Sequence, residues 1–286
     1  MEVTNSIHTV QTFRRRQGAP PLGFVPTMGY LHEGHLELVR RARAENDSVA
    51  VSIYVNPKQF GPSEDLSRYP RDLDRDLLLL RAEGVDLVFT PDDSVMYPPS
   101  FQTQVLVGAV TQSLEGARRP THFAGVATVV AKLFNIVQPT RAYFGQKDAQ
   151  QTVVVRQMVR DLNFDLEIVV CPTVREADGL AMSSRNKYLS PEQREAATVL
   201  YRALSTAEAH WHNGTLDGAA LRAAMTEVLA TEPLARPDYV SAADPHTLRE
   251  WEGPVPEGAG VLLSMAVYVG QTRLIDNFLL EGNADA

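Results

Sequence analysis

Two histidines, separated by Glu33 and Gly34, stand in the segment PTMGYLHEGHLELV, which spans residues 26–39. An apolar run, LGFV, precedes the segment, and a helical pattern begins near Gly34. The N-terminus of a helix offers unpaired N–H groups and the positive end of a dipole, which together attract phosphate. His32 and His35 can therefore face one triphosphate, and Gly34 leaves no side chain between them. The spacing predicts a phosphate site directly after the first strand.

Two other interpretations of the histidine pair stay open. A zinc site would need a third ligand at a sensible spacing, and the sequence offers neither that ligand nor the glutamate of an HExxH helix. Surface histidines beside a helix cap are the other alternative, since a four-residue pattern is a weak signal by itself. The position of the pair after an apolar run favours the phosphate site.

A second polar motif, MSSRN, covers residues 182–186. The hydroxyls of Ser183 and Ser184 can donate hydrogen bonds, and Arg185 can brace a departing pyrophosphate. The HxGH pattern resembles the nucleotidyltransferase superfamily, which includes the class I aminoacyl-tRNA synthetases, and such enzymes often carry a second basic motif. MSSRN could supply that motif here, with an ordinary polar loop as the alternative.

Apolar runs alternate with helical patterns up to Cys171 and indicate the elements that position these motifs. The pattern predicts strands over 22–25, 49–55, 85–89, 142–144 and 166–171, and helices over 35–46, 71–83, 125–137 and 148–162. Strands separated by helices of this length form βαβ units and a parallel sheet. Ligands bind beyond the carboxyl ends of such strands, where the polar motifs lie.

The pattern changes after about residue 175. Two amphipathic helices are predicted over 191–213 and 217–231, and two strands over 261–269 and 272–278. The short GQTR junction between the two strands indicates a hairpin. We expect a doubly wound, Rossmann-type α/β domain over residues 1–174 and a smaller α+β domain over 175–286.

Composition argues against several classes of function. The formal net charge is −8 and the basic clusters are short, which argues against a polynucleotide partner. No run of 18 apolar residues occurs and the N-terminal segment lacks the apolar stretch of a secretory signal, so we expect a cytoplasmic protein without a membrane span. The lone cysteine, Cys171, ends an apolar run and is predicted to be a buried strand residue.

Five segments together resemble the pantothenate synthetase family in order and spacing. They are PTMGYLHEGH, SIYVNPKQFGPSEDLSRYPR, RRPTHFAGVATVVAKLFNIV, YFGQKDAQQ and DGLAMSSRNKYLS, and they span residues 26–190. The resemblance implies that pantoate and ATP form pantoyl-adenylate and pyrophosphate, after which β-alanine displaces AMP to give pantothenate. It also implies a homodimer, Mg²⁺ accompanying ATP, and a C-terminal domain that closes over the site.

The resemblance assigns roles to individual residues. It implies catalytic roles for His32, His35, Lys147 and Arg185, and ATP contacts for these four together with Pro26, Thr27, Met28, Gly145, Asp148, Met182, Ser183 and Ser184. Met28, Gln59 and Gln151 match pantoate-contacting positions, Asn56 is a companion to them, Arg119 and His122 frame the mouth of the site, and Asp76 matches the magnesium region. Amide side chains can bond the hydroxyls of pantoate, and apolar side chains can contact its methyl groups, so these residue types fit that substrate.

The sequence departs from the commonest family pattern at four positions. Tyr30 and Thr121 replace small residues, Lys58 replaces an apolar residue, and Gln146 replaces a glutamate. None of these changes removes an expected phosphate donor. Tyr30 and Gln146 could alter substrate affinity.

Two competing functions are compatible with parts of the sequence. Another HxGH nucleotidyltransferase would form a dinucleotide-like product, but the two glutamines and the NPKQFG segment argue against it. A non-catalytic ATP-sensing module on the same fold would not need His32, His35, Lys147 and Arg185 to be intact. Dependence of pyrophosphate release on pantoate would separate both from a ligase.

Overall fold

The computed structural model describes residues 1–16, 20–62 and 64–282, which fall into two compact units. The first unit comprises Met1–Gln146 and Gln151–Pro172, and the second comprises Lys147–Gln150 and the chain from Thr173 onward. The assignment of residues 1–174 as the substrate-binding domain and 175–286 as a lid stays a prediction. No helix among the described residues is both long and apolar enough to cross a membrane.

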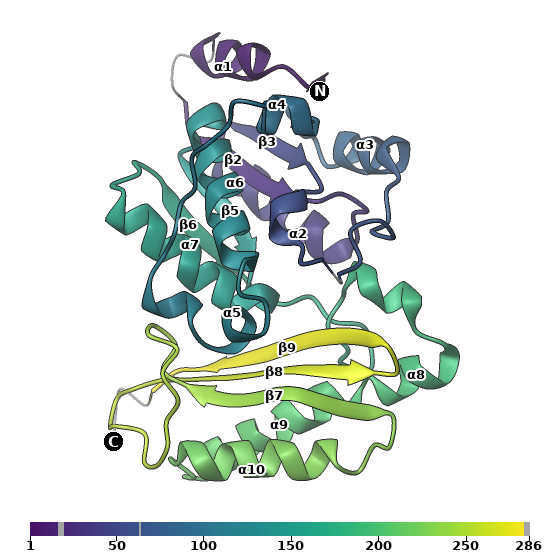
Figure 1. The fold of residues 1–286 in the computed structure, drawn as a ribbon, viewed down its shortest axis with the longest axis vertical. Coiled ribbons are helices and arrows are strands. Elements are labelled where there is room, and N and C mark those ends of the chain that lie inside the picture. The colour runs from purple at the N-terminus through teal and green to yellow at the C-terminus, as the bar shows by residue number, and fades with distance from the viewer. Residues whose placement is uncertain (17–19, 63, 283–286) are drawn as a thin grey trace. The chain divides into compact units, whose positions relative to one another are not determined.

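The described part of the first unit contains a six-stranded parallel sheet, in the order β1-β4-β3-β2-β5-β6 (Figure 1). Its strands are β1 (Glu2–Thr4), β2 (Leu22–Thr27), β3 (Ser48–Ile53), β4 (Leu87–Phe89), β5 (Arg141–Gly145) and β6 (Glu167–Cys171). The predicted parallel sheet is confirmed. Strand β1 was not predicted, because three largely exposed residues give no apolar run. Cys171 is buried at the end of β6, as predicted, and burial raises the pKa of its thiol to about 11.

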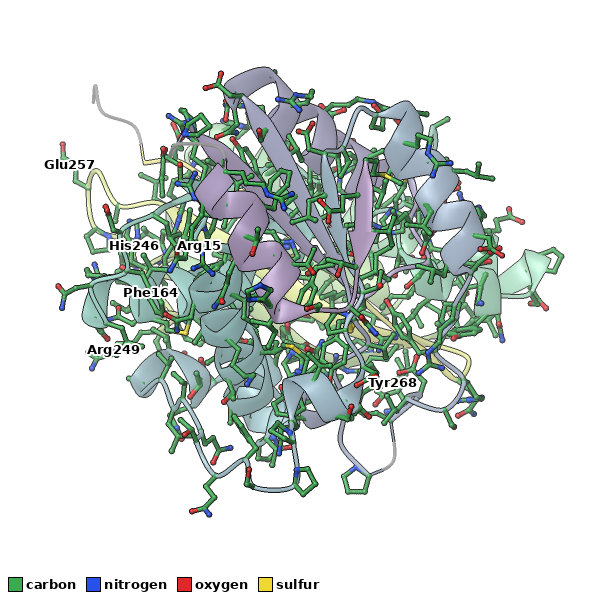
Figure 2. All side chains as sticks on the ribbon, turned by 90° about the horizontal axis from the view of Figure 1, so that it is seen from above. Arg15, Phe164, His246, Arg249, Glu257 and Tyr268 are labelled. Carbon is green, nitrogen blue, oxygen red and sulfur yellow. The ribbon has the colours of Figure 1, made fainter. Side chains whose placement is uncertain are left out.

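Helices cover both faces of this sheet. The helices in this part of the chain are α1 (Ile7–Arg16), α2 (Glu33–Glu45), α3 (Leu73–Ala82), α4 (Asp93–Met96), α5 (Leu114–Arg118), α6 (His122–Val137) and α7 (Ala149–Asp161). Successive strand residues point to opposite faces. Tyr143 joins a core cluster with residues of α2 and α3, whereas the ring of Phe144 meets Phe134 of α6 at 6.4 Å between centroids. Phe134 also contacts Phe164, which Figure 2 labels, at 5.7 Å.

The strand order creates a switch point between β2 and β5. From β2 the chain moves to β3 and then β4 on one side, and it later adds β5 and β6 on the other side. Helices that follow β2 and β5 therefore leave the sheet toward opposite faces, and in sheets of this kind ligands bind beyond the carboxyl ends of the strands at such a point. The HxGH segment follows β2, and the GQKD segment follows β5.

The second unit contains a three-stranded antiparallel sheet, β7 (Ala235–Ala243), β8 (Val261–Val269) and β9 (Thr272–Leu280), and the helices α8 (Pro191–Ala196), α9 (Val199–His212) and α10 (Gly218–Leu229). Residues of α9, α10 and β8 share one apolar core. The predicted β8–β9 hairpin is confirmed, with Val269 opposite Thr272. Strand β7 was not predicted, because Pro237 and Asp238 are typical of turns; the register shifts between Pro237 and Tyr239. Arg236 lies 4.3 Å over the ring of Tyr268, which Figure 2 labels.

The prediction of one helix over residues 191–213 was wrong, because α8 and α9 are separate. The interruption lies at Ala197 and Thr198. The Thr198 hydroxyl donates to the carbonyl of Glu195 (2.8 Å), and the Thr198 N–H bonds the same carbonyl three residues back rather than four. A threonine that bonds the preceding turn in this way tightens the helix locally.

Candidate active site

The turn between β2 and α2 has an unusual backbone, since Gly29 (φ 79°) and Tyr30 (φ 51°) are both left-handed. A Cβ on Gly29 would lie 2.9 Å from the Ile53 side chain, so this position requires glycine for space as well as for conformation. Asp76 of α3 holds the turn from outside. Its Oδ2 accepts from the N–H of Tyr30 (2.7 Å) and its Oδ1 accepts from the N–H of Leu31 (2.8 Å).

Both predicted phosphate-binding histidines begin the helix that follows this turn. His32 is the N-cap residue of α2, and its Nδ1 accepts from the N–H of Gly34 (3.2 Å). The Nδ1 of His35 accepts from the N–H of His32 (3.3 Å), and the two ring centroids are 4.1 Å apart. A neutral imidazole that accepts at Nδ1 carries its proton on Nε2. Both rings therefore offer Nε2–H donors at a helix N-terminus.

Asp76 is almost fully buried, with 1% of its surface exposed. Burial raises the pKa of its carboxyl, although the two backbone N–H groups oppose that shift by stabilising the anion. Its support of the HxGH turn is a role that the sequence did not predict. Within the described residues, no group of three or more His, Cys, Asp and Glu side chains is arranged to hold a metal ion. The magnesium role of Asp76 stays a prediction.

The predicted pantoate contacts Met28, Asn56 and Gln59 lie together. Asn56 caps the short 3₁₀ helix η1 (Pro57–Gln59), which follows β3. Its amide donates to the Oε1 of Gln59 (3.1 Å), and the Nε2 of Gln59 donates to the sulfur of Met28 (3.1 Å). Because β2 and β3 are parallel, the segments that follow them meet at one edge of the sheet. The three side chains predicted to contact pantoate from these segments, two amides and a thioether, are thus adjacent.

The start of α6 clamps η1 from the other side. The carbonyl of Gln59 accepts from Nδ1–H of His122 (2.9 Å) and from a guanidinium N–H of Arg119 (3.3 Å). A Cβ on Gly125 would lie 2.2 Å from the carbonyl oxygen of Lys58, so only glycine allows this approach. Arg119 and His122 therefore hold the loop that carries Gln59, and Gly125 is a residue whose importance the sequence did not reveal.

Of the two side chains that bond the Gln59 carbonyl, Arg119 is in an ion pair and His122 is neutral. Arg119 makes a two-point ion pair with Glu64 (2.8 and 2.6 Å). Burial, with a smaller contribution from the adjacent Arg119 charge, lowers the pKa of His122 to about 4. His122 is therefore neutral near pH 7, in the tautomer that donates from Nδ1.

Other predicted site residues lie at the ends of β2 and β5 or in the helix that follows β5. Pro26 and Thr27 end β2, and the Thr27 hydroxyl donates to the carbonyl of Ser52 (2.8 Å). Gly145 ends β5, and a Cβ at this position would meet no atom within 4 Å. Gln151 lies, half-buried, in the first turn of α7.

The remaining predicted residues belong to the second unit. Lys147 and Asp148 lie in the 3₁₀ turn η3 (Gln146–Asp148), and the Lys147 carbonyl accepts from the amide of Asn277 (2.9 Å). Met182 precedes Ser183, the N-cap of η4 (Ser184–Tyr188), and the Ser183 hydroxyl oxygen accepts from the N–H of Arg185 (3.2 Å).

The MSSRN loop is braced by an internal polar framework. Asn186 donates to the carbonyl of Ala181 (3.1 Å) and to Glu176 (3.2 Å). Arg175, which pairs through both arms with Asp276 (2.7 and 2.9 Å), fixes the chain just before the loop. The second unit thus presents a basic turn held by hydrogen bonds on both sides. Convergence of Lys147 and Arg185 with the two histidines on one triphosphate stays a prediction.

Comparison with known sequences gives a consistent family. The family described as pantoate-beta-alanine ligase matches residues 2–279. A pantothenate synthetase of Chloroflexus aggregans is 66% identical over 275 residues, covering 96% of this chain and 99% of that protein. A pantothenate synthetase of Roseiflexus castenholzii is 62% identical over 277 residues, with coverage of 96% and 99%.

Solved structures agree with the sequence comparisons. The crystal structure of pantothenate synthetase from Thermus thermophilus has a TM-score of 0.90 at 51% identity and covers 97% of this chain and 99% of that one. The pantoate-beta-alanine ligase from Francisella tularensis, solved in complex with beta-gamma ATP and beta-alanine, has a TM-score of 0.79 at 34% identity, with coverage of 98% and 97%.

Proposed function

The chain belongs to the pantoate–β-alanine ligase family, and from this membership we propose that it condenses pantoate with β-alanine at the expense of ATP. In the first step the carboxylate of pantoate attacks the α-phosphorus of ATP, and the bond to the β-phosphate oxygen breaks. Pantoyl-adenylate forms and pyrophosphate leaves. In the second step the amine of β-alanine attacks the acyl carbon, loses a proton, and displaces AMP to give pantothenate.

The orientation of His32 and His35 carries the proposal. Each ring accepts a backbone N–H at Nδ1, so each offers an Nε2–H donor at the start of α2. Negative charge approaches negative charge when a carboxylate attacks a phosphate, and fixed donors at that point lower the barrier. The site needs no covalent nucleophile, because the adenylate is the activated intermediate.

We assign the remaining roles from the family pattern. Lys147 bridges the phosphate and the pantoate carboxylate, Asp148 contacts the ribose or adenosine, and Arg185 with Ser183 and Ser184 holds the β- and γ-phosphates. Support comes from the Francisella tularensis relative, which was solved with an ATP ligand and β-alanine. Gln59, Gln151 and Met28 receive pantoate.

Magnesium in this proposal enters with ATP. Mg²⁺ usually keeps several waters and binds through substrate phosphates and one or two carboxylates. The residues fit a metal of that kind rather than one in a protein cage, because within the described part of the chain no three His, Cys, Asp or Glu side chains gather around one point. The homodimer expected from the family remains part of the proposal.

One assay tests the reaction. The purified chain is incubated with ATP and Mg²⁺, and pyrophosphate and AMP are measured with pantoate, with β-alanine, and with both. We expect pyrophosphate release to require pantoate, and formation of pantothenate to require β-alanine. Pyrophosphate release that ignores pantoate would overturn the substrate assignment.

Single-donor variants test the roles of His35 and Lys147. His35→Ala and Lys147→Ala should each lower kcat by roughly 10²- to 10³-fold, as loss of one fixed donor does in other enzymes. Thermal unfolding of the same samples is the control for folding. Near wild-type turnover in either variant would remove that residue from the mechanism.

A further inference from the structure

Asn56 uses its whole hydrogen-bonding capacity within the protein. The residue is buried, with 1% of its surface exposed. Its Oδ1 accepts from the hydroxyl of Tyr97 (2.8 Å) and the N–H of Lys58 (3.3 Å). Its Nδ2 donates to the carbonyl of Gly125 (3.2 Å) and to the Oε1 of Gln59 (3.1 Å). A primary amide makes about two bonds through each of these atoms, so none is left for a substrate.

Two backbone partners fix which way the Asn56 amide faces. A backbone N–H can only donate, so the oxygen of Asn56 must face Lys58. A carbonyl can only accept, so the nitrogen must face Gly125. The orientation therefore follows from the neighbours and does not depend on how the two amide atoms are assigned. The bond from Tyr97 is the shortest of the four and holds the amide from the third side.

The orientation of Asn56 determines that of Gln59. The second N–H of Asn56 needs an acceptor, so Gln59 must turn its Oε1 toward Asn56 and its Nε2 away. That Nε2 points at the sulfur of Met28, 3.1 Å distant. A thioether is a weak acceptor, so a better acceptor on a ligand beside Met28 can take up an N–H of Gln59. Burial raises the pKa of the Tyr97 phenol, which keeps this hydroxyl a donor.

We propose that Tyr97 and Asn56 are positioning residues that set the polarity of the Gln59 amide, so that Gln59 offers the substrate N–H donors and not its carbonyl. The three residues Tyr97, Asn56 and Gln59 form what we term the amide relay. This inference rests on the proposed function, because it takes pantoate as the ligand of Gln59. In this proposal Asn56 acts on pantoate indirectly, through Gln59, and does not contact it. The ligand atom that Gln59 binds is a hydroxyl or carboxylate oxygen that accepts a hydrogen bond.

The amide relay is tested by a graded pair of variants. Asn56→Asp puts an acceptor in place of the donor, so Gln59 should turn its Nε2 toward residue 56 and present its carbonyl to pantoate. We expect the KM for pantoate to rise by about 100-fold or more, because two acceptors then oppose each other. Tyr97→Phe removes only the anchoring hydroxyl and should raise the same KM by about 10-fold, with kcat and the KM for ATP changed less than about twofold.

A matched control is the neighbouring tyrosine. The hydroxyl of Tyr54 donates to Asp93 at 2.8 Å, the same length as the bond from Tyr97, and the two rings are 6.4 Å apart. Tyr54→Phe removes a comparable hydroxyl that does not touch Asn56, so the KM for pantoate should stay as in the wild type. In a Gln59→Ala background, Tyr97→Phe should have no further effect on this KM, since coupled residues are not additive.

A measurement without substrate separates the amide relay from the proposed function. The side-chain amide NMR signals of Gln59 in the full-length chain should move in Tyr97→Phe and stay in place in Tyr54→Phe. Unmoved signals, or additive effects of Tyr97→Phe and Gln59→Ala on the KM, would overturn the amide relay while leaving the ligase activity standing. A wild-type chain that ignores pantoate would overturn the proposed function, and the NMR comparison would still decide whether Tyr97 orients Gln59.

Discussion

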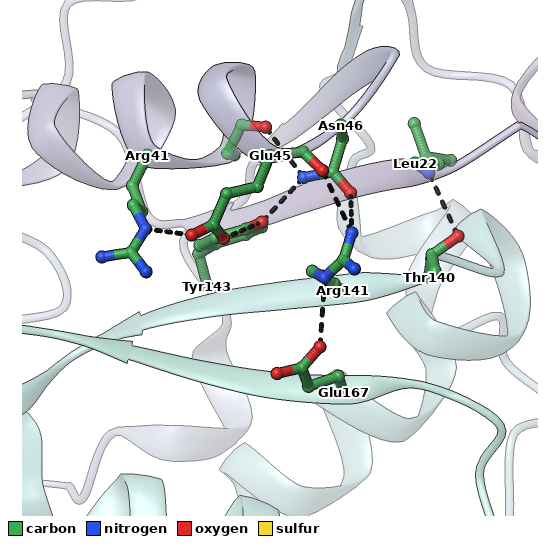
Figure 3. Close-up of polar contacts among 9 residues, drawn as sticks. Leu22, Arg41, Glu45, Asn46, Thr140, Arg141, Tyr143 and Glu167 are labelled. Atoms are coloured by element: carbon green, nitrogen blue, oxygen red, sulfur yellow. Dashed lines mark hydrogen bonds and ion pairs between the residues drawn. The ribbon is translucent and has the colours of Figure 1, made fainter.

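The two edges of the parallel sheet use polar side chains in opposite ways. At the amino edge, where the strands β2, β5 and β6 begin, polar side chains form hydrogen bonds and ion pairs with one another (Figure 3). Tyr143 is central to it: its hydroxyl accepts from Asn46 (2.7 Å) and donates to Glu45 (2.9 Å). Arg141 binds Asn46 (3.2 Å) and Glu167 (3.1 Å).

At the carboxyl edge the same kinds of group are held by the backbone. The imidazoles of His32 and His35 accept from N–H groups at the start of α2, Asp76 accepts from the turn before them, and the Gln59 carbonyl is fixed by α6. Holding one end of a side chain by the backbone orients the other end for a ligand. At the amino edge the donors and acceptors bond one another instead of a ligand. A polar network at the edge of a sheet is therefore not by itself a functional site.

The largest effect should come from Gly125→Ala. The added Cβ would lie 2.2 Å from the Lys58 carbonyl oxygen, so α6 and η1 must separate. We expect a loss of about 3 kcal/mol in the free energy of unfolding and a raised KM for pantoate, because overpacking against backbone cannot relax easily. Denaturant unfolding and steady-state kinetics measure the two effects.

Gly23→Ala is the matched variant at the amino edge. A Cβ there would lie 2.7 Å from the side-chain nitrogen of Asn46. This variant should lose stability but keep its KM values, because Asn46 faces no ligand. If both glycine variants raise the KM for pantoate equally, the contrast between the two edges does not hold.

The next effect is the dependence of stability on pH. The pKa of His122 is about 4 in the folded chain against 6.5 for an ordinary histidine. Between those pH values the unfolded chain binds a proton that the folded chain does not, so stability is full above pH 6.5 and falls as the pH decreases toward 4. The contribution is about 3 kcal/mol at most. Between pH 7 and pH 4 the free energy of unfolding should fall less steeply with decreasing pH in His122→Gln than in the wild type. The same pH dependence in both proteins would contradict this assignment.

Asp76→Asn should cost about 2 kcal/mol. The variant keeps one acceptor oxygen, but its NH₂ group faces a backbone N–H of the turn that leads to His32. Both the free energy of unfolding and kcat should fall. Unchanged kcat in a variant that is clearly destabilised would mean that the turn does not position the histidines.

Tyr143→Phe should cost about 1 kcal/mol of stability and leave the kinetics unchanged. The ring stays buried, and only the hydroxyl that links Asn46 with Glu45 is lost. A change in the KM for ATP would instead connect the amino edge with the site.

Glu167→Gln should have the smallest effect, less than about 0.5 kcal/mol. Its ion pair with Arg141 is open to solvent, with 65% of the Glu167 side chain exposed. Chemical denaturation in low and high salt measures the difference. A loss above about 1 kcal/mol would show that the network at the amino edge is more strongly coupled than its exposure indicates.

Much of the fold could be predicted because it depends on local patterns. The apolar runs that became β2, β3, β5 and β6 were found within two residues of their ends. The inner strands β2, β3 and β5 read as continuous apolar stretches because they are largely buried on both faces. The N-terminus of α2 was found from the histidine and glycine spacing. Strand β7 was not predicted, because its proline and aspartate are typical of turns. A register shift in the pairing with β8 accommodates these residues, and the sequence pattern does not reveal that shift.

The sequence by itself determined the family, the parallel sheet, and the residue types at the site, because each of these depends on composition, periodicity and motif order along the chain. Only the tertiary structure decided that Asp76 supports the HxGH turn, that Gly125 allows η1 to approach α6 closely, and that Asn56 orients the amide of Gln59. These roles depend on contacts between residues 3 to 69 positions apart and on which end of an amide faces which neighbour. Sequence patterns carry the types of such residues but not their orientation, which is fixed only when the surrounding backbone groups are in place.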